Sequence, residues 1–504
     1  MPRTAEQAYS ELIRRVKEGA LLGSCASVLG WDERTYMPHA GSSHRAEQMA
    51  LLARMTHEMM TAPEIGELLA ELETSSLTRD GDGIPAANLR EIRRSYNRAV
   101  KLPKELVEEI ARVTTRAQQV WQEARQADDF SRFQPWLQKV VDLKRQEAQA
   151  VGYSTVPYDA LLDEYEPSAT TAEITKVFAA LHEDLVPLVG AILGSRRKPK
   201  REILERDYPV REQEAFGKAA AAAIGFDFDS GRLDVTTHPF CSGIGPGDCR
   251  ITTRYNPRRF NDAFFGILHE AGHGIYDQGL DPDHFGTPAG SAASLGIHES
   301  QSRLWENQVG RGSAFWEHFF PKAQQTFACL RDVKLDDYIF AINDVQPSFI
   351  RVEADEATYN MHIILRFEME QALISGDLQP ADVPGAWNER FKKSFQLTPP
   401  NNAQGCLQDI HWSMGGLGYF PTYTLGNLYA AQFMDQARRD LGDLDADFRR
   451  GEYARMKGWL NEKIHRPGHR YPAGELCKRV TGEPLSHKPL IAYLRAKYEP
   501  LYQI

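Results

Sequence analysis

Residues 267–276 read I-L-H-E-A-G-H-G-I-Y, and they decide how the rest of the chain is interpreted. His269 and His273 lie four residues apart, so on a helix both imidazoles leave one face about one turn apart. Two imidazole nitrogens at this spacing can hold one Zn²⁺. Glu270 lies about 100° further round the helix, where it can act as a general base on a water held there. The pattern predicts a zinc-binding helix that also carries its base.

The residues around this pattern favour a buried helix. The alternative is a surface helix with two solvated histidines, because H-E-x-x-H arises by chance in a few per cent of chains this long. A surface position is disfavoured because the neighbouring residues are apolar: Phe264, Phe265, Leu268, Ile275 and Tyr276. Gly272 and Gly274 each cost a helix about 1 kcal/mol relative to alanine. We therefore expect them to permit a close backbone approach.

A catalytic zinc needs a third protein ligand and an open position. Glu299, in the segment G-I-H-E-S-Q-S-R at 296–303, is the best candidate. Two histidines and a distal glutamate form the ligand set of thermolysin-type zinc peptidases. Asp277 is the rival ligand, although a hydrogen bond to a ligand histidine suits it better. His298 is expected to be only a neighbour, and a paired surface carboxylate is the alternative for Glu299.

Most of the chain shows helical periodicity. Apolar residues recur at i, i+3 and i+4 in residues 12–21, 45–61, 104–125, 133–149, 172–193, 212–224, 358–373 and 423–437. Only 232–240 and 249–255 are rich in β-branched residues, with the turn-like S-G-I-G-P-G-D between them. We expect these two segments to form a β-hairpin that packs on helices. The fold class is therefore mostly α.

The composition is that of a folded acidic protein. The 504 residues include 42% hydrophobic and 25% charged residues, and the net charge is −10. This balance gives no reason to expect a nucleic-acid surface. The most apolar segment, 177–193, contains His182, Glu183, Asp184 and Pro187, so we expect no membrane span. One helical unit over 1–504 is expected, with a possible subdivision into 1–195 and 202–504 around the basic linker 196–201.

The cysteines indicate a reducing compartment. None of the six belongs to a C-x-x-C pair, and the N-terminus lacks the apolar core of a signal peptide. We therefore expect a cytoplasmic protein. Cys241 and Cys249 flank a glycine-rich turn and could approach each other; we expect them to be free, with a disulfide as the alternative.

Six further motifs follow one another along the chain. They are W-D-E-R-T-Y-M-P at 31–38, H-P-F at 238–240, D-C-R-I-T at 248–252, H-E-S-Q at 298–301, I-R-V-E-A-D at 350–355 and G-C-L-Q-D-I-H-W at 405–412. With the zinc helix, they resemble the carboxypeptidase Taq family of metallocarboxypeptidases. The resemblance runs from Trp31 to Tyr423 and covers most of the chain.

The resemblance implies a large helical body with a central active-site cleft, related to the angiotensin-converting-enzyme and neurolysin peptidases. A small β-hairpin or sheet beside the zinc helix completes the expected architecture. It also implies a homodimer that releases single C-terminal residues from peptides, with broad specificity and poor action at proline. By this analogy His269, His273 and Glu299 hold one zinc per chain, for which cobalt can substitute. Glu270 is then the general acid/base.

Two candidates for stabilising the reaction's oxyanion follow from the same analogy. Related helical zinc peptidases place a His and a Tyr there, which selects His411 and Tyr423. A purely packing role is the alternative for each. The glycines at 415, 416 and 418 permit either a mobile loop that closes over substrate or a plain turn.

An exopeptidase must also hold the substrate's free carboxylate, which an arginine does best. Arg351 is the first candidate and Arg250 the second. The alternative is internal pairing, of Arg250 with Asp248 and of Arg351 with Glu353 or Asp355.

The expected hairpin offers a strand edge that could pair with an extended peptide. His238 and Thr252 would then line the cleft; the alternative is a hairpin that only roofs the site. For the chain as a whole, the competing functions are a zinc oligopeptidase that cleaves internally and a peptide-binding protein without turnover. Retention of Glu270 disfavours the second, because binding alone needs no base.

Overall fold

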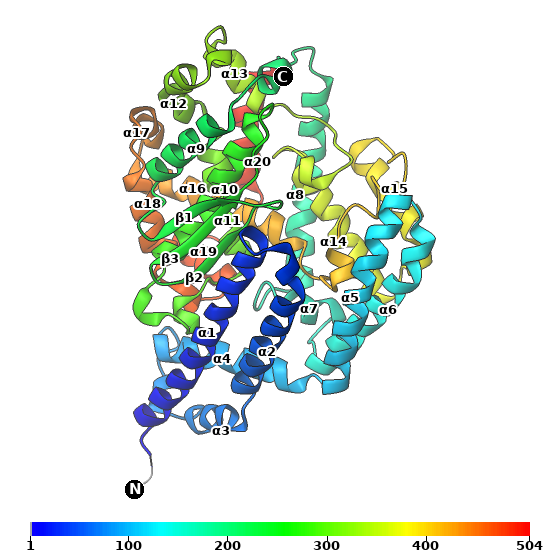
Figure 1. The fold of residues 1–504 in the computed structure, drawn as a ribbon, viewed down its shortest axis with the longest axis vertical. Helices are drawn as coiled ribbons and strands as arrows, with labels where there is room; N and C mark the ends of the chain where they lie inside the picture. The colour runs from blue at the N-terminus through cyan, green and yellow to red at the C-terminus, as the bar shows by residue number, and fades with distance from the viewer. Residues whose placement is uncertain (1–2) are drawn as a thin grey trace. The chain divides into compact units, whose positions relative to one another are not determined.

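The computed structural model describes residues 3–504. Its helices are α1 (Ala5–Thr35), α2 (Ser42–Met60), α3 (Pro63–Leu72), α4 (Ile84–Lys101), α5 (Lys104–Ala127), α6 (Phe130–Val151), α7 (Pro157–Leu162), α8 (Thr171–Gly194), α9 (Val210–Ile224), α10 (Phe260–Gly279), α11 (Leu295–Arg303), α12 (Ser313–Thr326), α13 (Leu335–Ile342), α14 (Tyr359–Ser375), α15 (Val383–Phe395), α16 (Pro421–Leu441), α17 (Leu444–Arg450), α18 (Ala454–Leu460), α19 (Ala473–Thr481) and α20 (Lys488–Tyr502). The mostly α prediction is confirmed (Figure 1). Each helical stretch expected from periodicity lies within one of these helices or differs from it by a few residues.

The small sheet has three strands rather than the expected two. They are β1 (Gly231–Val235), β2 (Cys241–Gly245) and β3 (Asp248–Thr253), in the order β1-β3-β2. β1 runs parallel to β3, and the hairpin partner of β3 is β2. The prediction that 232–240 and 249–255 form the hairpin is therefore wrong, because the glycine-rich segment read as a turn supplies a strand.

The chain folds into two compact units, each assembled from three segments. Unit 1 comprises residues 1–99, 199–342 and 430–484, and unit 2 comprises 100–198, 343–429 and 485–504. The chain leaves a segment of unit 2 at residue 198 and enters a segment of unit 1 at residue 199. This boundary lies in the basic linker 196–201, whose charged residues are exposed. The single cut into 1–195 and 202–504 stays a prediction.

In unit 1 the sheet and the helix α10 pack together. α10 contacts β2, β3, α9 and α11. The apolar side of its first turns joins an aromatic cluster of Phe216, Phe260, Phe264, Trp316 and Phe327. Burial of this cluster fixes α10, and with it the residues that the sequence analysis singled out.

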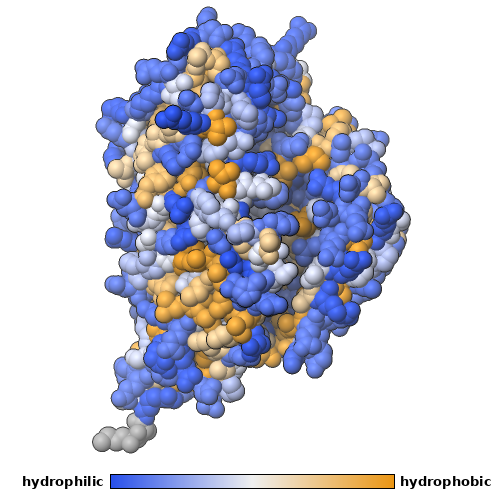
Figure 2. All heavy atoms as spheres, in the orientation of Figure 1, coloured by the Kyte–Doolittle hydropathy of each residue, from blue (hydrophilic) through white to orange (hydrophobic). Residues whose placement is uncertain are grey.

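In unit 2, α8 packs against α7, α14 and α20. By length and composition alone α8 could cross a membrane, which differs from the expectation for 177–193. Its buried residues follow helical spacing, among them Phe178, Leu181 and Leu185, as in a core helix. The face of the molecule seen in Figure 2 is mostly hydrophilic, with smaller hydrophobic areas between the polar residues.

Candidate metal centre

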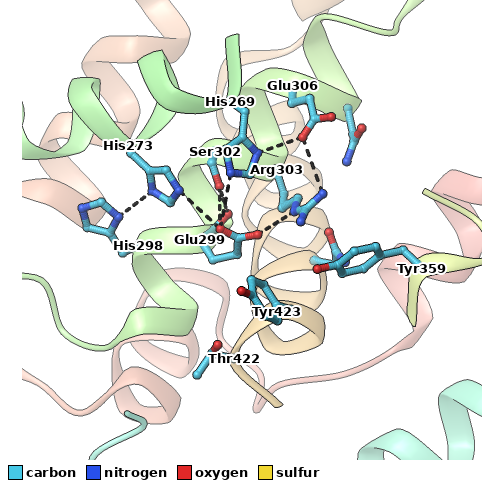
Figure 3. Close-up of polar contacts among 12 residues, drawn as sticks. His269, His273, His298, Glu299, Ser302, Arg303, Glu306, Tyr359, Thr422 and Tyr423 are labelled. Carbon is cyan, nitrogen blue, oxygen red and sulfur yellow. Dashed lines mark hydrogen bonds and ion pairs between the residues drawn. The ribbon is translucent and has the colours of Figure 1, made fainter. Parts of the chain in front are cut away.

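Three side chains predicted to bind metal converge in unit 1. His269 and His273 project from α10, and Glu299 projects from α11 (Figure 3). Glu299 Oε2 lies 3.7 Å from His269 Nε2 and 3.3 Å from His273 Nε2. One ligand atom from each residue lies within 4.8 Å of the others. Two imidazole nitrogens and one carboxylate oxygen at these separations fit a single divalent cation.

His269 is oriented by a carboxylate that the sequence analysis missed. Glu306 Oε2 lies 2.9 Å from His269 Nδ1, which leaves Nε2 directed at the centre. Glu306 belongs to a short π-helix, η6 (Leu304–Val309), that continues α11. Its spacing of seven residues from Glu299 places both on one helix face, a signal that could have found it. Such an outer hydrogen bond fixes the tautomer and raises the basicity of a ligand histidine.

His273 is oriented through a chain of two residues. Its Nδ1 lies 2.5 Å from His298 Nδ1, and His298 Nε2 lies 2.9 Å from Asp277 Oδ1. For His273 to bind a cation through Nε2, Nδ1 must carry the proton, which it donates to His298; His298 then donates from Nε2 to Asp277. Asp277 thus acts on His273 indirectly, and His298 is the link rather than a mere neighbour.

The oxygens of Glu299 have separate partners. Oε1 accepts a hydrogen bond from Arg303 Nε at 2.7 Å, whereas Oε2 faces the two histidines and accepts from Ser302 Oγ at 3.1 Å. Arg303 also lies 3.5 Å from Glu306. Glu299 therefore presents one oxygen to the centre, because Arg303 holds the other.

Burial and charge set the protonation states of the centre. Burial lowers the pKa of His273 to about 4, so its imidazole is neutral near pH 7, as a metal ligand must be. Burial also raises the pKa of Glu270 to about 7, and the nearby charge of Glu299 adds to this effect. The pKa of Glu306 shifts in the opposite direction. Although burial opposes its ionisation, the hydrogen bond to His269 and the charge of Arg303 lower this pKa to about 2. A carboxyl group whose pKa lies near 7 suits a group that takes and returns a proton.

Of the two glycines in α10 that were expected to permit a close backbone approach, Gly272 has that role, and Gly274 makes room for a side chain. A Cβ on Gly272 would lie 2.6 Å from the backbone oxygen of Gln301 and 2.7 Å from Ser302 Cα. A Cβ on Gly274 would lie 2.5 Å from the ring of Phe226. Gly272 therefore lets α10 approach the backbone of α11 closely enough to bring Glu299 to the histidines.

The predicted residues Arg351, His411 and Tyr423 lie in unit 2. Arg351 is 5% exposed and pairs with Asp409, with Nε at 3.0 Å and Nη2 at 2.8 Å, rather than with Glu353 or Asp355. Its Nη1 donates to Tyr359. Arg351 is thus paired internally, which was the alternative to a substrate role, but its partner is Asp409.

Arg366 shares the same carboxylate, since its Nε donates to Asp409 Oδ2 at 2.7 Å. Although burial opposes ionisation of Asp409, the Arg366 and Arg351 guanidiniums hold its pKa well below its usual range. Two guanidiniums therefore share one carboxylate, which leaves an excess positive charge. Nearby, His411 Nε2 lies 3.4 Å from the Tyr423 hydroxyl, and burial lowers the pKa of His411 to about 4.

The candidates near the sheet have other contacts. Arg250 pairs with Asp248 at 2.7 Å and lies over the ring of Trp31, 4.3 Å from its centroid. His238 is exposed. Thr252 is fully buried, and its hydroxyl hydrogen-bonds the backbone of Phe240. The expectation that Thr252 lines a cleft is therefore wrong, because its side chain anchors the loop before β2.

Comparison with known proteins gives a consistent result. A model of the carboxypeptidase Taq (M32) metallopeptidase family matches residues 11–498. The chain is 48% identical to thermostable carboxypeptidase 1 of Thermus thermophilus, over 99% of this chain and all of that protein. It is 38% identical to carboxypeptidase 1 of Bacillus subtilis, over 99% of each. The crystal structure of the M32 carboxypeptidase from Deinococcus radiodurans superposes with a TM-score of 0.95 at 38% identity, covering 99% of this chain and all of that one.

Proposed function

The chain belongs to the carboxypeptidase Taq (M32) metallopeptidase family, and from this premise we propose that it releases single C-terminal residues from peptides with a zinc ion held by His269, His273 and Glu299. One observation carries the proposal. The Nε2 atoms of both histidines and one oxygen of Glu299 face one another, while the opposite atoms of all three are held by other residues. A ligand set oriented in this way is typical of a zinc peptidase. Broad specificity and poor action at proline are part of the proposal.

The metal ion, when bound, would polarise the scissile carbonyl and make a nearby water more acidic. Cobalt, whose ligand preferences overlap those of zinc, is expected to substitute.

Glu270 moves the proton in this scheme. Its carboxylate takes a proton from the attacking water as the C–O bond forms, and returns it to the amide nitrogen as the C–N bond breaks. The pKa of about 7 that burial gives Glu270 supports both directions of transfer. The second proton of the water remains on the new carboxylic acid and is lost to solvent.

The unit 2 residues supply the remaining roles in the proposal. His411 and Tyr423, whose polar atoms are 3.4 Å apart, stabilise the oxyanion by hydrogen bonding. Arg351 holds the terminal carboxylate of the substrate. The excess positive charge of the Arg351–Asp409–Arg366 cluster supports this assignment, because an added carboxylate would balance it.

Location and assembly complete the proposal. All six cysteines are free. This supports a reducing compartment such as the cytoplasm. The proposed assembly is a homodimer, by family resemblance, and peptides are the proposed substrates.

A pair of peptides tests the proposed activity. An N-acetylated peptide with a free C-terminus and its C-terminally amidated twin are incubated with the zinc-loaded protein and followed by mass spectrometry. The expected result is a ladder that shortens from the free C-terminus, with the amide intact. Internal fragments from both peptides would instead establish an oligopeptidase, and two intact peptides with zinc bound would favour a binding protein.

A further inference from the structure

Two cysteines and an aspartate meet between the sheet and the helix α10, outside the His–Glu centre. Cys241 Sγ of β2 lies 3.6 Å from Cys249 Sγ of β3. Asp277 Oδ2 of α10 lies 3.9 Å from the first sulfur and 4.0 Å from the second. All three potential ligand atoms lie within 4.8 Å of one another.

These separations are close to those of ligands around one zinc ion. Two sulfurs bound to zinc at 2.3 Å with a tetrahedral angle lie about 3.8 Å apart, and a sulfur and a carboxylate oxygen about 3.6 Å apart. The observed distances differ from these by only a few tenths of an ångström, which small side-chain rotations can supply. We propose that Cys241, Cys249 and Asp277 form a second metal site, for zinc or another thiophilic divalent cation.

Glycines make room for this arrangement. A Cβ on Gly243 would lie 2.5 Å from Asp277 Oδ2, so any other residue there would displace the carboxylate from the two sulfurs. A Cβ on Gly274 would lie 3.4 Å from Cys249 Sγ. The position of the Asp277 carboxylate beside the two sulfurs therefore depends on the absence of a side chain at residue 243.

The register of β2 and β3 disfavours a disulfide bond between Cys241 and Cys249. Gly243, not Cys241, lies opposite Cys249, so the two cysteines are diagonal neighbours on one face. Diagonal neighbours have Cα atoms about 7–8 Å apart, beyond the usual range for a disulfide. A metal ion, which sits between its ligands, spans such a pair without moving the strands.

The two oxygens of Asp277 have different partners in this geometry. Its Oδ1 accepts from His298 Nε2 at 2.9 Å, which leaves Oδ2 for the sulfurs. The carboxylate is about one-fifth exposed and Cys241 is half-buried, so a cation can reach the site. On binding, the metal forms two bonds to sulfur and one to oxygen, and both thiols release their protons to solvent.

The site is also joined to the His–Glu centre. Asp277 contacts His298, and His298 contacts His273. An ion at the second site would hold Asp277 in the position that orients this chain. Asp277 is thus a positioning residue shared by the two centres.

Crystals of the full-length, zinc-soaked protein test the proposal through anomalous difference maps at the zinc edge. We expect one peak between the two sulfurs and Asp277, separate from any peak at His269. Cys241→Ser should abolish the first peak and weaken zinc binding there more than about 100-fold, since even the loss of an outer partner of a ligand costs about 10–100-fold. Cys25→Ser, which changes an exposed cysteine, is the control and should change neither peak.

The peak at the two cysteines and the peak at His269 are measured independently in the same map. The outcome for the second metal site therefore does not depend on the proposed function. Absence of a peak at the cysteines in the wild-type protein would overturn the second site. So would a peak that persists unchanged in Cys241→Ser, or a Cys241–Cys249 disulfide detected by mass spectrometry of the unreduced protein.

Discussion

At the scale of single residues, the hydrogen bond from His269 to Glu306 is the feature of the centre that is easiest to isolate. Glu306→Ala removes the partner of Nδ1, so the ring is free to rotate, and we expect zinc affinity at the His–Glu centre to fall about 10- to 100-fold. Glu306→Gln, which can still accept from Nδ1, should lose less. Competition with a chelator in a Cys241→Ser background measures the affinity of this centre alone.

Glu317→Ala is the matched control, because Glu317 is exposed and pairs with Arg449. It should bind zinc like the parent protein. Equal affinities for Glu306→Ala and the control would show that Glu306 does not orient His269.

Arg351 is the residue on which exopeptidase specificity depends in this account. Arg351→Ala should raise KM for free-acid peptides about 10- to 100-fold, the usual value of a hydrogen bond to a charged group. Cleavage of amidated peptides, however slow, should keep its KM. Arg390→Ala, which removes an arginine that lies 3.6 Å from Glu368, serves as the control. Equal KM increases for acid and amide peptides would remove Arg351 from this role.

At the scale of elements, the closeness of α10 and α11 brings Glu299 to the histidines. Gly272→Ala places a Cβ within 2.6 Å of a backbone oxygen of α11, so the helices must separate. We expect a loss of about 1–3 kcal/mol of stability, typical of overpacking, together with weaker zinc binding. Thermal unfolding and zinc competition measure the two effects.

Gly266→Ala is a control on the same helix, because its Cβ would meet no atom closer than 4.0 Å. It should be neutral or stabilise the protein by up to about 1 kcal/mol, as alanine favours the helix. If both variants bind zinc and unfold alike, the close approach at Gly272 has no bearing on the site.

The sequence predicted the elements whose signals are local. The periodicity of helices such as α5 and α8 is a property of short segments, and the helices it predicts are confirmed. The spacing of His269 and His273 is also a local signal, and both residues lie on α10. β2 was missed because its glycines resemble a turn. Gly243 is there to leave space for Asp277, 34 positions further along the chain, and no local pattern shows this.

The difference between local signals and long-range packing also explains why the sequence did not predict the roles of Glu306 and Asp409. Glu306 lies in a π-helical segment and acts on a histidine of another helix. The partner of Arg351 is Asp409 rather than its sequence neighbours. Both contacts depend on tertiary packing, which brings together residues 37 and 58 positions apart.

At the scale of the whole molecule, buried carboxyl groups make stability depend on pH. Burial raises the pKa of Glu370 to about 7, although Tyr158, Trp412 and Gly418 all donate hydrogen bonds to it. The folded state therefore binds this proton more tightly than the unfolded state, in which the pKa is near 4.3. The stability that protonated Glu370 contributes is fully present below pH 4.3 and is lost as the pH rises through 7.

From this shift we expect stability to fall by an amount on the order of 3 kcal/mol between pH 4.3 and pH 8. Glu370→Gln, which cannot ionise, should flatten that part of the profile. Urea unfolding across this pH range measures the slope, with Glu368→Gln on the exposed side of α14 as control. An unchanged slope in Glu370→Gln would assign the pH dependence to other groups.

The most direct test of the whole account follows release of C-terminal residues by the wild-type protein and Glu270→Gln, with zinc at the His–Glu centre verified in both samples. Glu270→Gln keeps the ligands but cannot accept the proton, so we expect zinc to stay bound and kcat to fall about 100- to 10,000-fold. Glu214→Gln, which changes a half-exposed residue paired with Lys218, should match the wild type. Release of C-terminal residues by zinc-bound Glu270→Gln at the wild-type rate would contradict the account.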